Sequence, residues 1–371
     1  DGFLMVGAGQ AAADARRRTL KTSIGCVGVG LHTGRRVRLT LHPAAAGSGI
    51  RFRRADLGGV EIPARFDRVV DTRLCTALGS ADVPEARVGT IEHLMAAFVA
   101  CGIDDAVVEL DGPEVPILDG SAAPFIFLLD CAGSVASGLP RGMVEVLRPV
   151  RVEDASGAWA ELRPNPENGC DAALEIDFPN TAIGRQSLAL RLSPRAVRDT
   201  LATARTFTLA EDVARLRAAG LAQGGSLANA VVVDGPLVLN PGGLRCPDEF
   251  VRHKLLDLVG DLALAGLPIR GRFAGHRSGH ALNNRLLHAL FAEAGACRVV
   301  GGLEPLVTGP AAAAENGAAI ARLPAAAAPA VAGAARPPAG PVPAKPSPAG
   351  AGTGADRASG MDLARRPRLV V

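Results

Sequence analysis

The segment DEFVRHKLLDLVGDLALAG, residues 248–266, decides the fold because it predicts a long and largely apolar helix with one polar stripe. A proline precedes it and two acidic residues occupy its first turn, as is typical of a helix start. His253, Asp257 and Asp261 follow at intervals of four residues, which places them one above another on a single face. Buried carboxylates beside an imidazole need a compensating cation, which a divalent metal supplies. A His–Asp pair on a solvated face has the same spacing, so the stripe alone leaves both interpretations open.

The segments on either side of this helix predict an α+β fold. In RRVRLTLHP, residues 35–43, apolar and polar residues alternate as in a half-buried strand. The preceding VGVGLHTG, residues 27–34, lacks the spacing of a phosphate loop and is followed by a strand, so it predicts a tight hairpin. Strands and helices gather in clusters, which favours α+β over a doubly wound sheet. A strand, a turn and a short strand are expected within 106–120, further strands at 143–154, 158–165 and 172–178, and helices at 89–102, 124–133, 194–204 and 283–295.

Length and composition predict two domains and an irregular C-terminal part. The 371 residues exceed one average domain, and a Gly/Pro break at 138–142 separates two series of strands and helices. From about residue 324 the chain is so rich in Ala, Pro and Gly that it cannot bury enough side chain to fold, and we expect disorder there. The expected division is a flexible N-terminal extension at 1–17, a first domain at 18–140, a second domain at 141–306 and a C-terminal extension at 307–371.

Charge and cysteine content narrow the functional classes. The chain has a net charge of +3. The six basic and two acidic residues after residue 323 carry +4, so the rest of the chain carries −1. With 11 Phe, 1 Trp and no Tyr, a stacking surface for nucleic acid is not expected. Seven scattered cysteines without a C-x-x-C pair fit neither a disulfide framework nor a structural zinc site. The longest apolar stretch is about half of the ~20 residues that a membrane-spanning helix needs, so we expect a cytoplasmic protein.

Two other places could supply chemistry together with the polar stripe. Glu92 and His93 stand near the start of an apolar helix, and His276 and His280 lie in a Gly/Ser-rich loop before the last helix. Two His and one Asp as ligands, with a spare Glu and a spare His, are the parts of a hydrolytic zinc site. Each motif is weak by itself, so the residues alone leave a metal hydrolase as one of several functions.

Six motifs follow one another from about residue 18 to residue 306: TLKTSIGCVGVGLHTGRRVRLTLHPA, VGTIEHLMAAFVACGIDDAVVELDGPEVPILDGSAAPF, ARTFTL, GGSLANAVVVD, LRCPDEFVRHKLLDLVGDLALAG and SGHALNN. Together they resemble the motifs of the UDP-3-O-acyl-N-acetylglucosamine deacetylase family. The resemblance implies hydrolysis of the N-acetyl group of UDP-3-O-[(3R)-3-hydroxyacyl]-N-acetylglucosamine to acetate and the free amine, the committed step of lipid A biosynthesis in Gram-negative bacteria. It also implies two similar two-layer α/β sandwich domains with the active site at their junction.

The resemblance implies one zinc ion per chain, bound by His93, His253 and Asp257 with water in the fourth position. Glu92 would take a proton from that water as it attacks the acetamide carbonyl. The hydroxyl of Thr206 would help to stabilise the oxyanion that results.

By the same resemblance, His280 would be a cationic general acid or electrostatic partner for the leaving amine. Asp261 would hold His280 in its charged form by raising its pKa. Lys254 is offset by one residue from the polar stripe, so its side chain would point away from that stripe and reach hydroxyl or phosphate groups of the substrate.

Substrate-binding residues are also implied by the resemblance. Phe178 would pack near the uracil and Phe207 would line the sugar. Arg277 suits a pyrophosphate, and Gly225 and Ser226 of the GGS motif would contact the substrate.

A further implied feature is an inserted β-α-β unit at about 206–235, whose apolar passage would receive the 3-O-acyl chain. Core packing explains its apolar residues equally well, and both uses stay open. The candidate lining consists of Leu209, Val213, Leu216, Leu221 and Leu227.

The sequence departs from the family pattern at Ala228, where an acidic residue is common, and at Cys246, where an aromatic one is common. His276 is an extra imidazole that we expect to be a solvated bystander. A non-catalytic sugar-nucleotide or acyl-chain binding protein would have lost at least one of five site residues, yet all five are present. They are Glu92, His93, His253, Asp257 and His280. The runner-up is a zinc amidohydrolase for another N-acyl sugar. We expect a monomer that binds the UDP-linked 3-O-acylated amino sugar and no nucleic acid.

Overall fold

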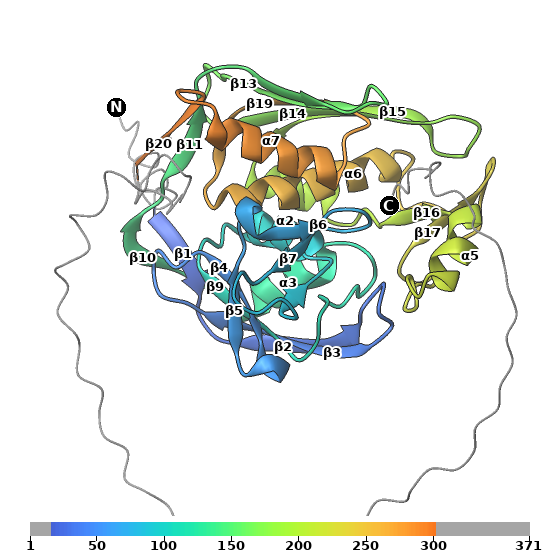
Figure 1. Cartoon of the computed structure of the whole chain (residues 1–371), viewed down its shortest axis with the longest axis horizontal. Helices are drawn as coiled ribbons and strands as arrows, with labels where there is room; N and C mark the ends of the chain where they lie inside the picture. The colour runs from blue at the N-terminus through green and yellow to red at the C-terminus, as the bar shows by residue number, and fades with distance from the viewer. Residues whose placement is uncertain (1–15, 302–371) are drawn as a thin grey trace, which may run out of the picture. The chain divides into compact units, whose positions relative to one another are not determined.

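Helices lie between two β-sheets in the computed structural model, which describes residues 16–301 (Figure 1). The predicted α+β fold is therefore confirmed. The predicted disordered tail and residues 1–15 of the predicted N-terminal extension lie outside the described residues. No helix among residues 16–301 is both long and apolar enough to cross a membrane.

The first half of the described chain forms a five-stranded sheet. Its strands, in spatial order, are β2 (Ile24–Val29), β3 (Arg36–Pro43), β9 (Ala106–Leu110), β4 (Ile50–Arg54) and β5 (Val60–Pro63). β2 and β3 form an antiparallel hairpin that pairs Val29 with Arg36, and Gly34 takes a φ of +63° in the turn between them. The predicted tight hairpin is confirmed. Alternate residues of β3, among them Leu39 and Leu41, are fully buried and face the helices.

The second half forms a seven-stranded sheet around β19 (Ile269–His276). β19 pairs antiparallel with β13 (Trp159–Arg163) and parallel with β14 (Cys170–Phe178) and β11 (Met143–Val146). The remaining strands are β12 (Val150–Glu153), β15 (Gly184–Leu192) and β20 (Cys297–Val300). The division into two domains stays a prediction.

The helices between the sheets carry most of the residues of interest. They are α2 (Glu92–Cys101), α3 (Ala123–Ala132), α6 (Glu249–Leu262) and α7 (His280–Ala292). α2 packs against α6, and α6 against α7 (Figure 1). α6 continues as a 3-10 turn to Gly266, whose φ of +80° ends the helix, so the predicted helix 248–266 is confirmed.

Three local predictions are wrong. The segment around Pro116 forms isolated bridges and no strand, because Pro116 and Gly30 are the single residue pair that it makes with the hairpin turn. The segment 138–142, expected to be a break, belongs largely to the strand β10 (Ser134–Pro140). β10 pairs with β1 (Arg16–Leu20), so the last residues of the predicted N-terminal extension are part of a strand. The expected loop before the last helix shrinks to residues 277–279, because His276 ends β19 and His280 begins α7.

Two small units stand beside the main sheets. The segment from residue 206 onward forms β16 (Phe207–Leu209), α5 (Ala210–Ala218) and β17 (Val231–Asp234), with β16 and β17 parallel, followed by β18 (Leu237–Val238). A three-stranded sheet consists of β6 (Val69–Asp71), β7 (Ala77–Gly79) and β8 (Arg87–Val88). The turn between β6 and β7 lies next to the start of α2, where Thr76 contacts Glu92.

Candidate metal centre

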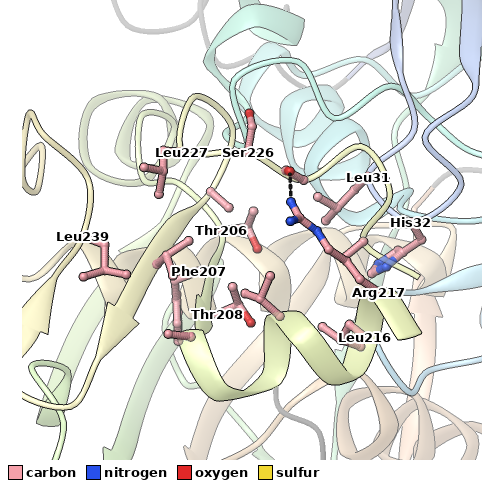
Figure 2. Close-up of a pocket in the computed structure, with 16 residues that line it drawn as sticks. Leu31, His32, Thr206, Phe207, Thr208, Leu216, Arg217, Ser226, Leu227 and Leu239 are labelled. Carbon is pink, nitrogen blue, oxygen red and sulfur yellow. Dashed lines mark hydrogen bonds between the residues drawn. The ribbon is translucent and has the colours of Figure 1, made fainter. Parts of the chain in front are cut away.

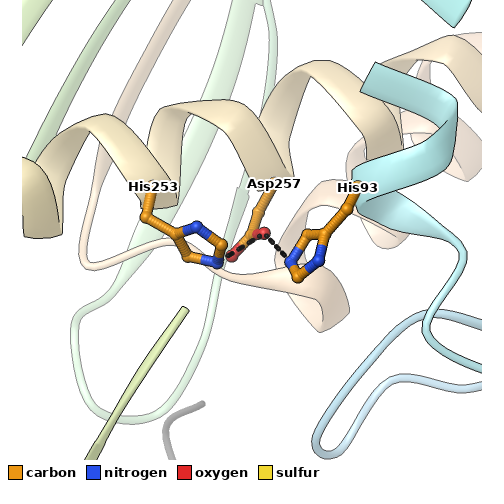
Figure 3. Close-up of side chains that lie close together, drawn as sticks. All are labelled: His93, His253 and Asp257. Carbon is orange, nitrogen blue, oxygen red and sulfur yellow. Dashed lines mark ion pairs between the residues drawn. The ribbon is translucent and has the colours of Figure 1, made fainter. Parts of the chain in front are cut away.

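Two histidines and one aspartate converge where α2 crosses α6. His253 and Asp257 lie one turn apart on α6, and His93 reaches them from α2 (Figure 3). Potential ligand atoms of the three residues lie within 4.8 Å of one another, and all three side chains are buried. Asp257 Oδ1 is 3.3 Å from His253 Nε2 and 3.5 Å from His93 Nε2. The structure thus brings together the three residues that the sequence singled out.

The charge states of these groups suit a metal ligand set. Burial lowers the pKa of His253 to about 4, which leaves the imidazole neutral with a lone pair for coordination. Burial opposes ionisation of Asp257, but the neighbouring His253 and Lys254 outweigh it and hold the pKa of that carboxyl well below its usual range. His253 Nδ1 donates to the carbonyl of Ala204 at 3.0 Å, so Nε2 is the free nitrogen that faces Asp257.

A divalent cation fits this cluster. Asp257 Oδ1 is buried and accepts no hydrogen bond from any residue in the described range 16–301, although a buried carboxylate oxygen is costly to leave unpaired. Two imidazoles and one carboxylate are a donor set that catalytic zinc sites use, and a three-ligand set leaves one position open. The residues present therefore match what such an ion requires.

Glu92, the first residue of α2, is held beside the cluster. Its Oε2 accepts a hydrogen bond from the backbone amide of Thr76 at 3.1 Å, and its Oε1 lies 3.8 Å from His280 Nε2. Burial raises the pKa of Glu92, because the charged carboxylate is poorly solvated there.

His280 and Asp261 form a buried hydrogen-bonded pair. His280 Nδ1 donates to Asp261 Oδ2 at 2.8 Å. The same carboxylate accepts from Asn283 Nδ2 at 2.9 Å and from the hydroxyl of Thr76 at 2.6 Å. Burial alone would lower the pKa of His280, but the Asp261 carboxylate outweighs burial and raises that pKa to about 9. His280 therefore carries a proton at neutral pH.

Lys254 differs from the expectation that it points away from the ligand stripe. Its side chain is buried and Nζ lies 3.1 Å from Asp257 Oδ2, so it reaches toward the cluster. The reason is the three-residue spacing of Lys254 and Asp257, which brings their side chains together on the helix surface.

An apolar cavity of about 300 Å³ opens next to the cluster (Figure 2). Thr206 lines both this cavity and the small space that holds His93 and Glu92, so the two spaces are adjacent. Of the five candidate lining residues, Val213, Leu216 and Leu227 face the cavity, whereas Leu209 packs against the core and Leu221 is not part of the lining.

The other candidate substrate residues are divided. Gly225, Ser226 and Phe207 line the cavity, and Phe178 packs edge-on against Phe207 with ring centroids 5.6 Å apart. Arg277 lines neither the cavity nor the metal cluster, and donates instead to the carbonyl of Ser156 at 2.6 Å.

His276 lines neither the cavity nor the metal cluster, and its side chain is 27% exposed. Its Nδ1 donates to Glu175 at 2.8 Å, and Arg277 Nε lies 3.1 Å from its Nε2. The alternation of β19 turns this imidazole toward the neighbouring strand β14, which carries Glu175.

Several residues of the site escaped the sequence analysis. Thr76 and Cys75 come from the β6–β7 turn, where no spacing links them to the helices. His32 falls in the predicted hairpin turn, yet it lines both cavities, and neither of its buried ring nitrogens has a hydrogen-bond partner within residues 16–301. Its backbone amide donates to Glu114, a buried carboxylate that also accepts from Thr90.

Comparison with known proteins gives a consistent result. A family model described as UDP-3-O-acyl N-acetylglycosamine deacetylase matches residues 17–292. Three similar proteins are named UDP-3-O-acyl-N-acetylglucosamine deacetylase. The one from Phenylobacterium zucineum is 49% identical over 285 residues, covering 76% of this chain and 96% of that protein. The one from Acidithiobacillus ferrooxidans is 48% identical over 276 residues, covering 74% and 90%. The one from Anaeromyxobacter sp. is 48% identical over 286 residues, covering 76% and 91%.

Proposed function

The chain belongs to the UDP-3-O-acyl N-acetylglycosamine deacetylase family, and from this premise we propose that it hydrolyses the N-acetyl group of UDP-3-O-acyl-N-acetylglucosamine. The products are acetate and the free amine, and the reaction serves lipid A biosynthesis. The observation that carries the proposal is the convergence of His93, His253 and Asp257 beside the buried carboxylate of Glu92. A cytoplasmic monomer, as expected from the sequence, is part of the proposal.

The metal of the proposal is one zinc ion per chain, held by His93, His253 and Asp257. When bound, zinc supplies a Lewis acid that polarises a carbonyl oxygen and lowers the pKa of water toward neutrality. Lys254 balances the negative charge on Asp257 Oδ2, which leaves Oδ1 as the oxygen for coordination.

Glu92 acts as the general base. Its Oε2 is held by the Thr76 amide, so Oε1 is the oxygen that takes the proton of the attacking water. The start of α2 lies directly beside the cluster, because His93 is the next residue.

His280 acts as the general acid for the leaving amine. Its Nε2 faces the reaction space, since Nδ1 is engaged by Asp261. The raised pKa keeps a proton available at neutral pH, and the nearby carboxylate of Glu92 completes an acid–base pair on one side of the cluster.

Thr206 and the apolar cavity would receive the rest of the substrate. The buried hydroxyl of Thr206 stands between the cluster and the cavity, where an oxyanion would form. The cavity would hold the 3-O-acyl chain along Val213, Leu216 and Leu227. Phe178 and Phe207 would contact the nucleotide sugar, and Arg277 would have to leave Ser156 to reach a phosphate.

The proposal is tested by measuring acetate release from UDP-3-O-acyl-N-acetylglucosamine. The wild-type chain should release acetate, and Glu92→Gln should lower turnover on the order of 10²- to 10⁴-fold with unchanged metal content. Glu85→Gln is the matched control, because Glu85 is an exposed carboxylate away from the cluster. A wild-type chain that released no acetate would refute the proposed function.

A further inference from the structure

Thr76 uses all of its polar groups to hold the wall of the metal centre. The residue is 1% exposed. Its amide donates to Glu92 Oε2 at 3.1 Å, its hydroxyl donates to Asp261 Oδ1 at 2.6 Å, and its carbonyl accepts from the amide of Ile91 at 3.4 Å. One residue of a turn in the first half of the chain is thus bonded both to the start of α2 and to α6.

The bond to Glu92 decides how that carboxylate is oriented. A buried carboxylate without a fixed partner can rotate, and either oxygen can then face the reaction space. The Thr76 amide ties Oε2 and the carbonyl of Thr76 holds the backbone of Ile91, immediately before Glu92. Oε1 therefore remains the oxygen on the side of His280, 3.8 Å from its Nε2.

The bond to Asp261 decides how His280 is oriented. A hydroxyl-to-carboxylate distance of 2.6 Å lies in the range of strong, charge-assisted hydrogen bonds. Because Thr76 occupies Oδ1, Asp261 presents Oδ2 to His280 Nδ1 at 2.8 Å. Asn283 supports Oδ2 from the other side at 2.9 Å.

We propose that Thr76 is a positioning residue for the deacetylation, holding the base Glu92 through its amide and the acid His280 through Asp261. The inference rests on the proposed function. Thr76 acts through these two side chains and is not itself a catalytic residue. Loss of its hydroxyl leaves Asp261 Oδ1 buried without that donor, so the carboxylate can turn and His280 loses its fixed direction.

A purely structural role makes a different prediction. A threonine that only filled space in the turn would be replaced best by valine, which has nearly the same shape and lacks the hydroxyl. Serine keeps the hydroxyl and loses the methyl group. The two variants therefore separate hydrogen bonding from packing.

The test compares Thr76→Val with Thr76→Ser in the full-length, zinc-loaded chain. We expect Thr76→Val to lower kcat about tenfold or more with KM and zinc content unchanged, since a hydrogen bond to a charged group is lost. Thr76→Ser should keep kcat within about threefold of the wild type. This change is smaller than the tenfold that corresponds to 1.4 kcal/mol. Thr22→Val is the control, because the Thr22 hydroxyl also donates a hydrogen bond, to the carbonyl of Ala132. Neither residue lines the cavity or the space around the metal cluster.

A second readout does not depend on turnover. The imidazole nitrogen signals of His280, assigned with a His280→Gln variant, should change in Thr76→Val and stay as in the wild type in Thr76→Ser. If Thr76→Val fails to fold, Thr76→Ala takes its place in the comparison with Thr76→Ser.

The inference is overturned if Thr76→Val keeps the wild-type kcat and the wild-type His280 signals, or if Thr76→Ser loses as much kcat as Thr76→Val. A wild-type chain without acetate release would refute the proposed function instead, and the His280 signals would still show whether Thr76 orients that side chain.

Discussion

The backbone of Gly260 lies directly against the backbone of Glu92, so that a Cβ atom on Gly260 would stand 2.1 Å from the Glu92 carbonyl oxygen. Glycine inside a helix is unfavourable by roughly 1 kcal/mol relative to alanine. Here it allows α2 and α6 to approach closely enough for His93 to reach His253 and Asp257. The candidate metal centre thus depends on a residue that carries no ligand atom.

Gly260→Ala should therefore push α2 away from α6. We expect a loss of stability of about 1–3 kcal/mol, typical of overpacking, together with weaker zinc binding because His93 moves with α2. Thermal unfolding and zinc affinity measure the two effects. Gly138→Ala is the control, since a Cβ atom there meets open space. Wild-type zinc affinity in Gly260→Ala would show that the close contact is not needed for the site.

The pH dependence of turnover should have an alkaline limb set by His280. The folded pKa of about 9 means that the acid is protonated below that pH, so kcat should fall as the pH rises through about 9. Asp261→Asn removes the charge that raises this pKa, and the limb should move to lower pH. Asp199→Asn, at an exposed ion pair with Arg195, should leave the alkaline limb in place. An alkaline limb that stayed fixed in Asp261→Asn would argue against His280 as the acid.

Blocking the apolar cavity should harm only acylated substrates. Val213→Phe fills the space between α5 and β17, and kcat/KM for the 3-O-acylated substrate should fall about tenfold or more. The slow reaction expected on UDP-N-acetylglucosamine should be unchanged. Val135→Phe adds the same bulk at an exposed position of β10. Equal losses on both substrates would contradict the assignment of the cavity to the acyl chain.

The polar stripe of α6 was predictable from sequence because it is a local pattern. His253, Asp257 and Asp261 repeat at the helix period within one apolar segment, and the structure keeps that helix. The hairpin at Gly34 was predictable for a similar reason, since its glycines miss the spacing of a phosphate loop and a strand follows.

Features that depend on contacts between distant segments were not predictable. Thr76 is bonded to Asp261, which lies 185 positions later in the sequence. No motif in the sequence around Thr76 indicates that it belongs to a site. Lys254 was expected to point away because only the four-residue stripe was considered, whereas a buried amine needs a carboxylate and finds Asp257. The resemblance implies that Arg277 meets a pyrophosphate, whereas the structure shows it bonded to the carbonyl of Ser156.

Zinc titration of the metal-free chain, followed by acetate release from UDP-3-O-acyl-N-acetylglucosamine, tests the central claim most directly. One site built by His93, His253 and Asp257 predicts that activity rises with added zinc and levels off at about one equivalent per chain. Asp257→Ala should give little activity at one equivalent, because one of the three ligands is missing. Full acetate release from the metal-free chain, or none at any zinc loading, would contradict the account.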